Sequence, residues 1–189
     1  MRMPAVHVEL PDWVEAHVDW DAVYATDEAR VALAIELSRE NVRRGLGGPF
    51  GAAVFEQDSG RLVSVGVNLV VPLANSMLHA EVVAFMLAQR RLGTYTLAAP
   101  GLPAHVLASS CEPCAMCLGA SLWSGVCRIA AGALREDAMR MHFEEGPVFP
   151  ESYTYLEARG ISIVRGVLRD EASAVLETYV RGGGPLYNR

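Results

Sequence analysis

The middle of the chain holds a histidine and two cysteines, which are residue types that bind zinc readily. His79 stands two residues before Glu81. Cys114 and Cys117 are the two cysteines of the run Pro113-Cys114-Ala115-Met116-Cys117. Zn²⁺ accepts imidazole nitrogen and thiolate sulfur, and a catalytic site keeps a fourth position open for water. His79, Cys114 and Cys117 are therefore the predicted zinc ligands. Glu81 is then the acid that moves protons rather than a fourth ligand.

These residue types predict the hydrolysis of a carbon–nitrogen bond. Zinc lowers the pKa of bound water toward ~7, so hydroxide is available at neutral pH. A His-x-Glu followed by Pro-Cys-x-x-Cys is the signature of zinc deaminases, which remove an exocyclic amine from a base. Glu81 is predicted to take the water proton and to pass it to a ring nitrogen of the substrate, and the amine then leaves as ammonia.

A third cysteine leaves a second interpretation open. Cys111 precedes Cys114 by the same spacing that separates Cys114 from Cys117. A closed site of one histidine and three cysteines, which only stabilises structure, is therefore conceivable. Glu81 argues against this structural zinc-binding module, because such a site has no use for it. We expect Cys111, on the strand side of Pro113, to be a buried free thiol near the pocket.

The predicted ligands stand where two helices are expected to begin. Cys114 and Cys117 lie three residues apart at the start of a helix, so both thiolates share one face. His79 begins another helix, and the three ligands converge if both helix starts meet at one edge of a sheet. Helices are expected at 27–44, 79–92, 114–123, 135–141, 151–159 and 170–181, and strands at 6–10, 50–55, 62–67, 104–108, 126–131 and 161–168. This alternation predicts a three-layer α/β fold.

Length and composition limit the classes of function. The 189 residues fit one domain, with residues 1–25 as a leader that packs on the body and 151–189 as a C-terminal extension. The net charge of -6 gives no basic footprint for nucleic acid. No signal peptide and no apolar run of the ~20 residues that span a bilayer are recognisable. Four cysteines, three of them between positions 111 and 117, suit a metal site in the reducing cytoplasm better than disulfides.

The motif region resembles a known family. Cys111 to Ala120, together with Trp123, resembles the bacterial guanine deaminases, and 47–52 and Gly66-x-Asn68 are also similar to them. The resemblance runs from about residue 28 to 146. It implies a three-layer α/β/α cytidine-deaminase-like fold with a central mixed sheet of about five strands. It also implies a domain-swapped dimer whose C-terminal segment closes the partner's active site.

The same resemblance implies roles for individual residues. Asn68 would hold the base by its amide and Ala80 through its backbone, while Phe50 and Trp123 would pack against the ring. A flat base needs apolar faces and an amide that reads its edge, so these roles are chemically reasonable. The alternatives are that the two aromatic residues belong to the core and that Asn68 only forms a turn.

The chain departs from the guanine deaminases in one segment. Where they tend to carry Gly-Phe-Asp-Asp or Gly-Phe-Asp-Glu, this chain has His142-Phe143-Glu144-Glu145. The second proton-handling acid is therefore Glu144 or Glu145, and we favour Glu145. His142 in place of a glycine is expected to narrow the pocket or to add a hydrogen-bond donor.

The predicted substrate is a free amino-heterocycle. Guanine or a related or modified purine is favoured, and an s-triazine stays open because of the departure at His142. One rival is a cytosine-type base deaminase, which shares the zinc chemistry. Another is a tRNA adenosine deaminase, against which the acidic composition argues.

The end of the chain is predicted to take part in the site. Gly182-Gly183-Gly184 is a flexible hinge, and Pro185 makes the chain rigid again before Leu186, Tyr187 and Asn188. Frayed, functionless chain ends are the common alternative. We predict a homodimer in which Tyr187 helps to close an active site, its own or the neighbour's.

Overall fold

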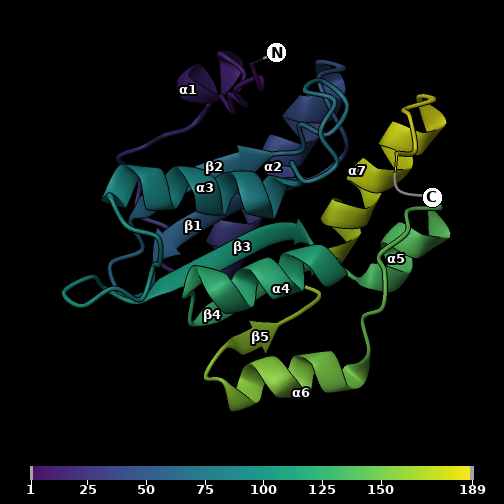
Figure 1. Cartoon of the computed structure of the whole chain (residues 1–189). Coiled ribbons are helices and arrows are strands. Elements are labelled where there is room, and N and C mark those ends of the chain that lie inside the picture. Colours follow the sequence, from purple (N-terminus) through teal and green to yellow (C-terminus); the bar gives the residue numbers. More distant parts are fainter. Residues whose placement is uncertain (1, 188–189) are drawn as a thin grey trace.

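Five strands form one mixed sheet in the order β2-β1-β3-β4-β5. The computed structural model describes residues 2–187 (Figure 1). The strand β1 pairs antiparallel with β2 and β3, whereas β3, β4 and β5 run parallel. The predicted mixed sheet of about five strands is confirmed. The strands are β1 Gly51–Glu56, β2 Leu62–Val67, β3 His105–Cys111, β4 Arg128–Ala133 and β5 Ser162–Val164.

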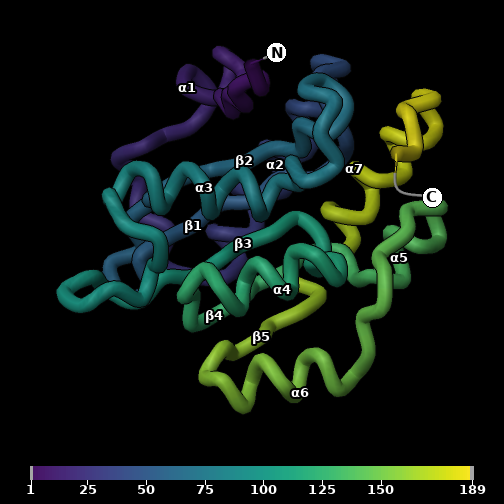
Figure 2. Tube along the Cα trace, in the orientation of Figure 1, coloured from purple at the N-terminus to yellow at the C-terminus, as the bar shows by residue number. Residues whose placement is uncertain are grey.

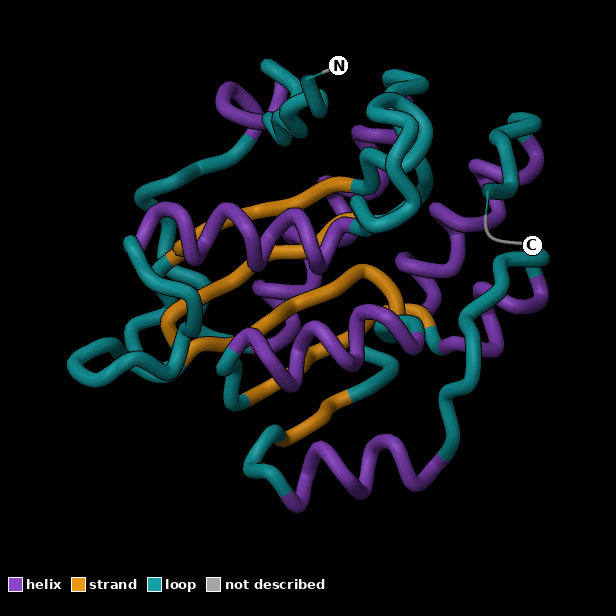
Figure 3. Tube along the Cα trace, in the orientation of Figure 1, coloured by secondary structure: helices purple, strands orange, loops and turns teal. Residues whose placement is uncertain are grey.

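Helices cover both faces of this sheet, as Figure 3 shows. Along β1, Ala53 and Phe55 join the hydrophobic core under α2 and α7, while Ala52 and Val54 join the core under α3, α4 and α6. This alternation is the period of two that a strand buried on both faces requires. The three-layer α/β/α prediction is thereby confirmed. The helices are α1 Trp13–His17, α2 Asp27–Arg43, α3 Ala80–Leu92, α4 Ala115–Ser124, α5 Arg135–Arg140, α6 Pro150–Ala158 and α7 Arg169–Arg181.

The strand pairing decides where the functional motifs meet. Because β1 is antiparallel to both neighbours, its first residues lie at the same edge as the last residues of β2 and β3. Gly51 pairs with Val67 of β2, and Ala52 pairs with Ser109 of β3. The helices α3 and α4 follow β2 and β3 in the chain, so both begin near this edge. We call this side of the sheet, where β1 begins and β2 and β3 end, the site edge.

The structure corrects several of the expected strands. The strand expected at 126–131 is displaced to Arg128–Ala133, and the one expected at 161–168 is limited to Ser162–Val164. Residues 6–10 form no strand. The strand β3 continues to Cys111 instead of ending at Ala108, because Ser109 and Cys111 pair with Ala131 and Ala133 of β4. The hydroxyl of the buried Ser110 accepts a hydrogen bond from the Gly51 amide (3.1 Å). Ser109 and Ser110 are polar residues of a type that favours turns, but the pairing of β3 with β4 keeps this segment in the sheet.

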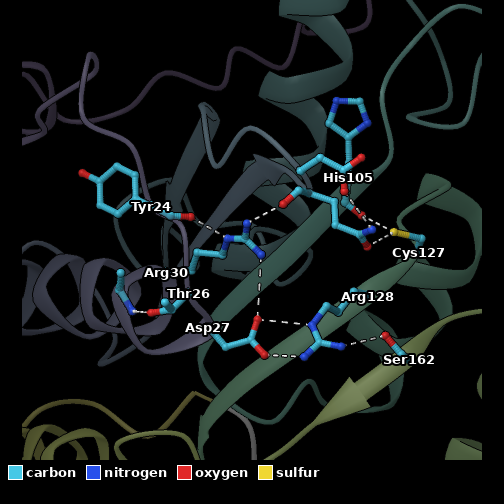
Figure 4. A network of polar contacts seen from close by, with 11 residues as sticks. Tyr24, Thr26, Asp27, Arg30, His105, Cys127, Arg128 and Ser162 are labelled. Atoms are coloured by element: carbon cyan, nitrogen blue, oxygen red, sulfur yellow. Dashed lines mark hydrogen bonds and ion pairs between the residues drawn. The ribbon is translucent and has the colours of Figure 1, made fainter.

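A polar network joins the ends of β4 and β5 that lie away from the site edge (Figure 4). Asp27, at the start of α2, pairs with Arg30 and with Arg128 of β4. Arg128 also donates to the Ser162 hydroxyl in β5 (3.1 Å), and Arg30 donates to the Tyr24 carbonyl (2.9 Å). The network attaches the first turn of α2 to the last two strands, so it supports the sheet from the side remote from the site edge.

The leader packs on the body, as Figure 2 shows above α2 and α3. Trp13 and Val14 of α1 are buried, and the Arg44 guanidinium lies 5.4 Å from the Trp13 ring centre. Arg91 of α3 lies 5.7 Å from the ring centre of Trp20. Between residues 2 and 187, no helix combines the length and the apolar character needed to cross a membrane.

Candidate active site

The three predicted zinc ligands converge at the site edge. His79 is the N-cap of α3, Cys114 is the N-cap of α4, and Cys117 lies in the first turn of α4. The Nδ1 atom of His79 lies 3.5 Å from Sγ of Cys114 and 3.7 Å from Sγ of Cys117. The ligand atoms of all three residues lie within 4.8 Å of one another. Two helix starts therefore bring together residues that are 35 positions or more apart in the chain.

These separations fit tetrahedral zinc. With Zn–S near ~2.3 Å and Zn–N near ~2.0 Å, tetrahedral angles place sulfur and nitrogen ~3.5 Å apart. The distances of 3.5 and 3.7 Å from His79 Nδ1 to the two sulfur atoms are close to that value. Cys111 does not belong to the group. Its buried thiol faces the carbonyl of Leu134 at 3.9 Å, so the residues fit the open site with three protein ligands.

Local electrostatics favour a thiolate at the metal position. The hydrogen bond from the Cys117 thiol, with a further one from His79, lowers the pKa of Cys114 to about 4. The start of α4 adds the positive end of the helix dipole. Thiolate is the form of cysteine that binds a metal, so Cys114 is prepared for it. Burial instead raises the pKa of Cys111 well above its usual value, as expected for an inert thiol.

Two buried carboxyl groups flank the ligands. Glu81 lies in the first turn of α3 with 6% of its surface exposed, and burial raises its pKa. Glu145 is equally buried, and burial together with the negative charges of Cys114 and Glu81 raises its pKa to about 8. Its carbonyl accepts the amide hydrogen of Ala115, which attaches this loop to the start of α4. Glu145 can therefore hold a proton at neutral pH and release it to a substrate.

Asn68 presents an unused donor at the same edge. It is completely buried where β2 ends, and its Oδ1 accepts from the Val70 amide (3.3 Å). Its Nδ2 has no hydrogen-bond partner among residues 2–187. Asn68 therefore forms the turn that its type favours and still keeps a donor for a ligand. Unpartnered buried donors are rare, and this one lies at the edge where the predicted zinc ligands converge.

Known proteins share this arrangement. The family model of the cytidine and deoxycytidylate deaminase zinc-binding region matches residues 25–133. The chain belongs to this deaminase family. The guanine deaminase of Bacillus subtilis is 34% identical over 140 residues, which are 74% of this chain and 85% of the relative. The resemblance inferred from the motif is confirmed.

Solved structures extend the similarity over nearly the whole chain. A structure of the guanine deaminase from Nitrosomonas europaea is 44% identical with a TM-score of 0.88, covering 95% of this chain and 98% of that one. A protein crystallised with 2,6-diaminopurine is 45% identical with a TM-score of 0.91, covering 97% of each chain. The chain is thus a zinc-binding hydrolase of the deaminase class, with the family's fold.

Aromatic side chains of this deaminase gather beside the ligands. Phe143 lies between Phe50 and Tyr187, with ring centres 5.0 and 5.8 Å away. The Tyr187 hydroxyl is buried without a hydrogen-bond partner in the described part of the chain. Phe143 stands directly before Glu144 and Glu145 in the sequence, and only this position indicated that it belongs to the site.

The C-terminal tail reaches the site of its own chain. The Tyr179 hydroxyl donates to the Pro185 carbonyl (2.8 Å), which turns the tail back after α7. A Cβ atom on Gly48 would meet the Tyr187 hydroxyl at 2.0 Å, so only glycine admits this approach. Asn188, which was also expected to contribute, lies outside the described residues.

Three of the residues predicted for the site have exposed side chains. Trp123 is 78% exposed, because it lies six residues after Cys117 and is turned from it by ~240° about α4. Glu144 is exposed, and its Oε1 accepts from the Gly146 amide (2.8 Å). His142 is exposed too, and its expected effect on the pocket stays a prediction. Ala80, the first residue of α3, is fully buried at the site edge.

A buried carboxylate that the motif did not single out, Glu112, stabilises the start of α4. Glu112 accepts hydrogen bonds from the Arg135 amide (2.6 Å) and the Tyr153 hydroxyl (3.1 Å), and pairs with Arg165 (3.0 Å). It therefore connects the start of α4 with α5, α6 and the loop after β5. Its only signal was an acidic residue inside the cysteine motif.

We expect His142→Gly to stabilise the deaminase. His142 has φ +68°, a left-handed conformation that costs a residue with a Cβ atom ~1 kcal/mol. His142→Gly should therefore raise the free energy of unfolding by ~0.5–1 kcal/mol relative to His142→Ala, which keeps the Cβ atom. Urea denaturation measures both. Equal stabilities of the two variants would contradict this explanation.

Proposed function

We propose that this protein removes the exocyclic amine of a free purine base, guanine or a close relative of it, with release of ammonia. The observation that carries the proposal is the buried, unpartnered Nδ2 of Asn68 at the sheet edge that holds the zinc ligands. A base offers the acceptor that this donor lacks. The similarity to guanine deaminases and to a protein that binds 2,6-diaminopurine supports the purine assignment.

The proposed pocket suits a flat, apolar-faced ring. Phe50 and Tyr187 supply aromatic faces, and Asn68 reads one edge of the base. Ala80 contributes its backbone at the start of α3, where amide hydrogens have no partner within the helix. A base bound in this way would place its amino-bearing carbon near the two buried carboxyl groups.

The proposed chemistry assigns one task to each carboxyl group. His79, Cys114 and Cys117 would hold zinc, whose Lewis acidity would make a water molecule nucleophilic at neutral pH. Glu81 takes a proton from the attacking water and transfers it to a ring nitrogen. Glu145, acting with Glu81, protonates the departing amine, so water and the amino-purine yield the oxo-purine and ammonia.

Two rivals share the zinc site. A tRNA adenosine deaminase must admit a polynucleotide, but the net charge is -6 and the tail packs beside the site. A cytosine deaminase needs a pocket for a single ring. An ammonia-release screen over guanine, cytosine, guanosine, an amino-s-triazine and tRNA separates them. We expect kcat/KM for guanine to exceed that for cytosine by about 100-fold or more. Faster turnover of cytosine or tRNA would refute the proposal.

We propose further that the enzyme is a homodimer. Trp123 on α4 and Tyr155 on α6 are exposed by 78% and 49%. Between these helices lies a groove of about 170 Å³ with apolar side chains such as Leu122. Exposed apolar patches of this kind commonly mark protein interfaces. The four unpaired cysteines also suit a reducing location, and we place the enzyme in the cytoplasm.

Light scattering tests the dimer. The wild type is expected at twice the chain mass of 20.4 kDa, and Trp123→Lys at the mass of one chain, because a charge would then stand in the apolar interface. Tyr95→Lys is the matched control, since Tyr95 is 88% exposed in the loop after α3. A monomeric wild type would contradict the proposal.

We also propose that Tyr187 closes the pocket of its own chain. Deleting residues 183–189 should leave zinc content and folding intact but lower kcat/KM by about tenfold or more, because water then enters the site. Deleting residues 188–189 alone is the control that separates Tyr187 from Asn188. Unchanged kinetics of the longer deletion would show that the tail has no catalytic part.

A further inference from the structure

Asn41 contacts two parts of the candidate site at once. It lies in the last turns of α2 and is completely buried. Its Nδ2 donates to the carbonyl of Gly48 (3.0 Å) and to the carbonyl of Asn68 (3.2 Å). Both hydrogens of one amide are thus used on the two segments that flank the site edge, one before β1 and one after β2.

The chain around Asn41 is built for close approach. A Cβ atom on Gly47 would meet the Asn68 carbonyl at 2.1 Å and Asn41 Nδ2 at 2.7 Å, so only glycine fits there. The Asn68 amide donates to the Phe50 carbonyl (3.0 Å), and the Phe50 amide donates to the Gly48 carbonyl (2.9 Å). Asn41 therefore closes a continuous set of hydrogen bonds that joins Gly48, Phe50 and Asn68.

The amide group of Asn41 is used for the two carbonyl groups that it holds. The Oδ1 atom of Asn41 is buried without a hydrogen-bond partner among residues 2–187. Such an atom is unfavourable, and a leucine of similar size would avoid the penalty. What a leucine could not do is hold two carbonyl groups in place.

We propose that Asn41 is a positioning residue for substrate recognition. By fixing the carbonyls of Gly48 and Asn68, it sets the direction of the free Asn68 Nδ2 donor and the place of the Phe50 ring. Gly48 is also the residue against which Tyr187 packs, so the tail rests on the same support. The inference rests on the proposed function in so far as the donor and the ring contact a purine base.

Kinetics with a stability control test the inference. Asn41→Leu should raise KM for guanine by about tenfold, the effect of one misplaced hydrogen bond, and change kcat by less than about threefold. Ser124→Ala is the control, because Ser124 is a buried residue with two hydrogen bonds at the far end of α4. In an Asn68→Ala background, the KM effect of Asn41→Leu should shrink to the part that acts through Phe50, while its loss of stability remains. A KM for Asn41→Leu equal to that of Ser124→Ala would overturn the inference.

Amide hydrogen exchange gives a readout that needs no substrate. Asn41→Leu should speed exchange about tenfold in residues 47–51 and 68–70 and leave 105–111 unchanged. Asn41→Ala serves if the leucine variant does not fold. Unchanged exchange in both segments would refute positioning by Asn41. A wild type that fails to release ammonia from guanine, with the exchange result as expected, would refute the proposed substrate and leave the positioning intact.

Discussion

Glu81→Gln is expected to lower kcat by about 10²–10⁴-fold, the usual contribution of a general acid–base group. Glutamine keeps the size of the side chain but cannot take a proton from water. The variant should keep one zinc per chain, because Glu81 is not among the three converging ligands. Steady-state ammonia release and elemental analysis on the same preparation measure both quantities.

Glu144→Gln is the matched control for that experiment. Glu144 is an exposed carboxylate one position before the buried Glu145, so its loss should leave kcat within about twofold of the wild type. The kcat of Glu145→Gln should lie between those of Glu81→Gln and Glu144→Gln, since Glu81 can still supply a proton to the leaving amine. Near-normal turnover of Glu81→Gln would show that another group moves the protons.

Cys117→Ala is expected to abolish zinc binding and activity together. Two protein ligands remain in that variant, and catalytic zinc sites have three. The zinc content should fall from one per chain to near zero after dialysis against a chelator. Turnover should fall below detection, because no group in the described chain replaces the Lewis acid.

Cys111→Ala is the control that separates the two cysteine patterns. Its thiol faces Leu134 rather than the ligand group, so this variant should retain zinc and most of its activity. Loss of zinc from Cys111→Ala would mean that Cys111 is a fourth ligand and that the site is closed. Retention of zinc by Cys117→Ala would contradict the ligand assignment directly.

The chemistry of the site was readable from the sequence. The zinc ligands and Glu81 lie a few residues apart at the starts of two helices, and such short spacings are visible in the sequence. The ends of those helices were also predictable, because Gly93 and Gly125 take positive φ angles that stop α3 and α4. The alternation of helices and strands was sufficient for the three-layer fold.

The contacts between distant segments were decided only by the tertiary structure. The strand β3 extends to Cys111 because that residue pairs with Ala133 of β4, and Asn41 meets Gly48 and Asn68 only because α2 packs across the site edge. Trp123 carried the right residue type for stacking on a base, but the turn of α4 directs it outward. Residue type and spacing therefore determined which groups do the chemistry. Strand pairing and helix packing, which depend on partners far away in the chain, decided which groups surround the substrate.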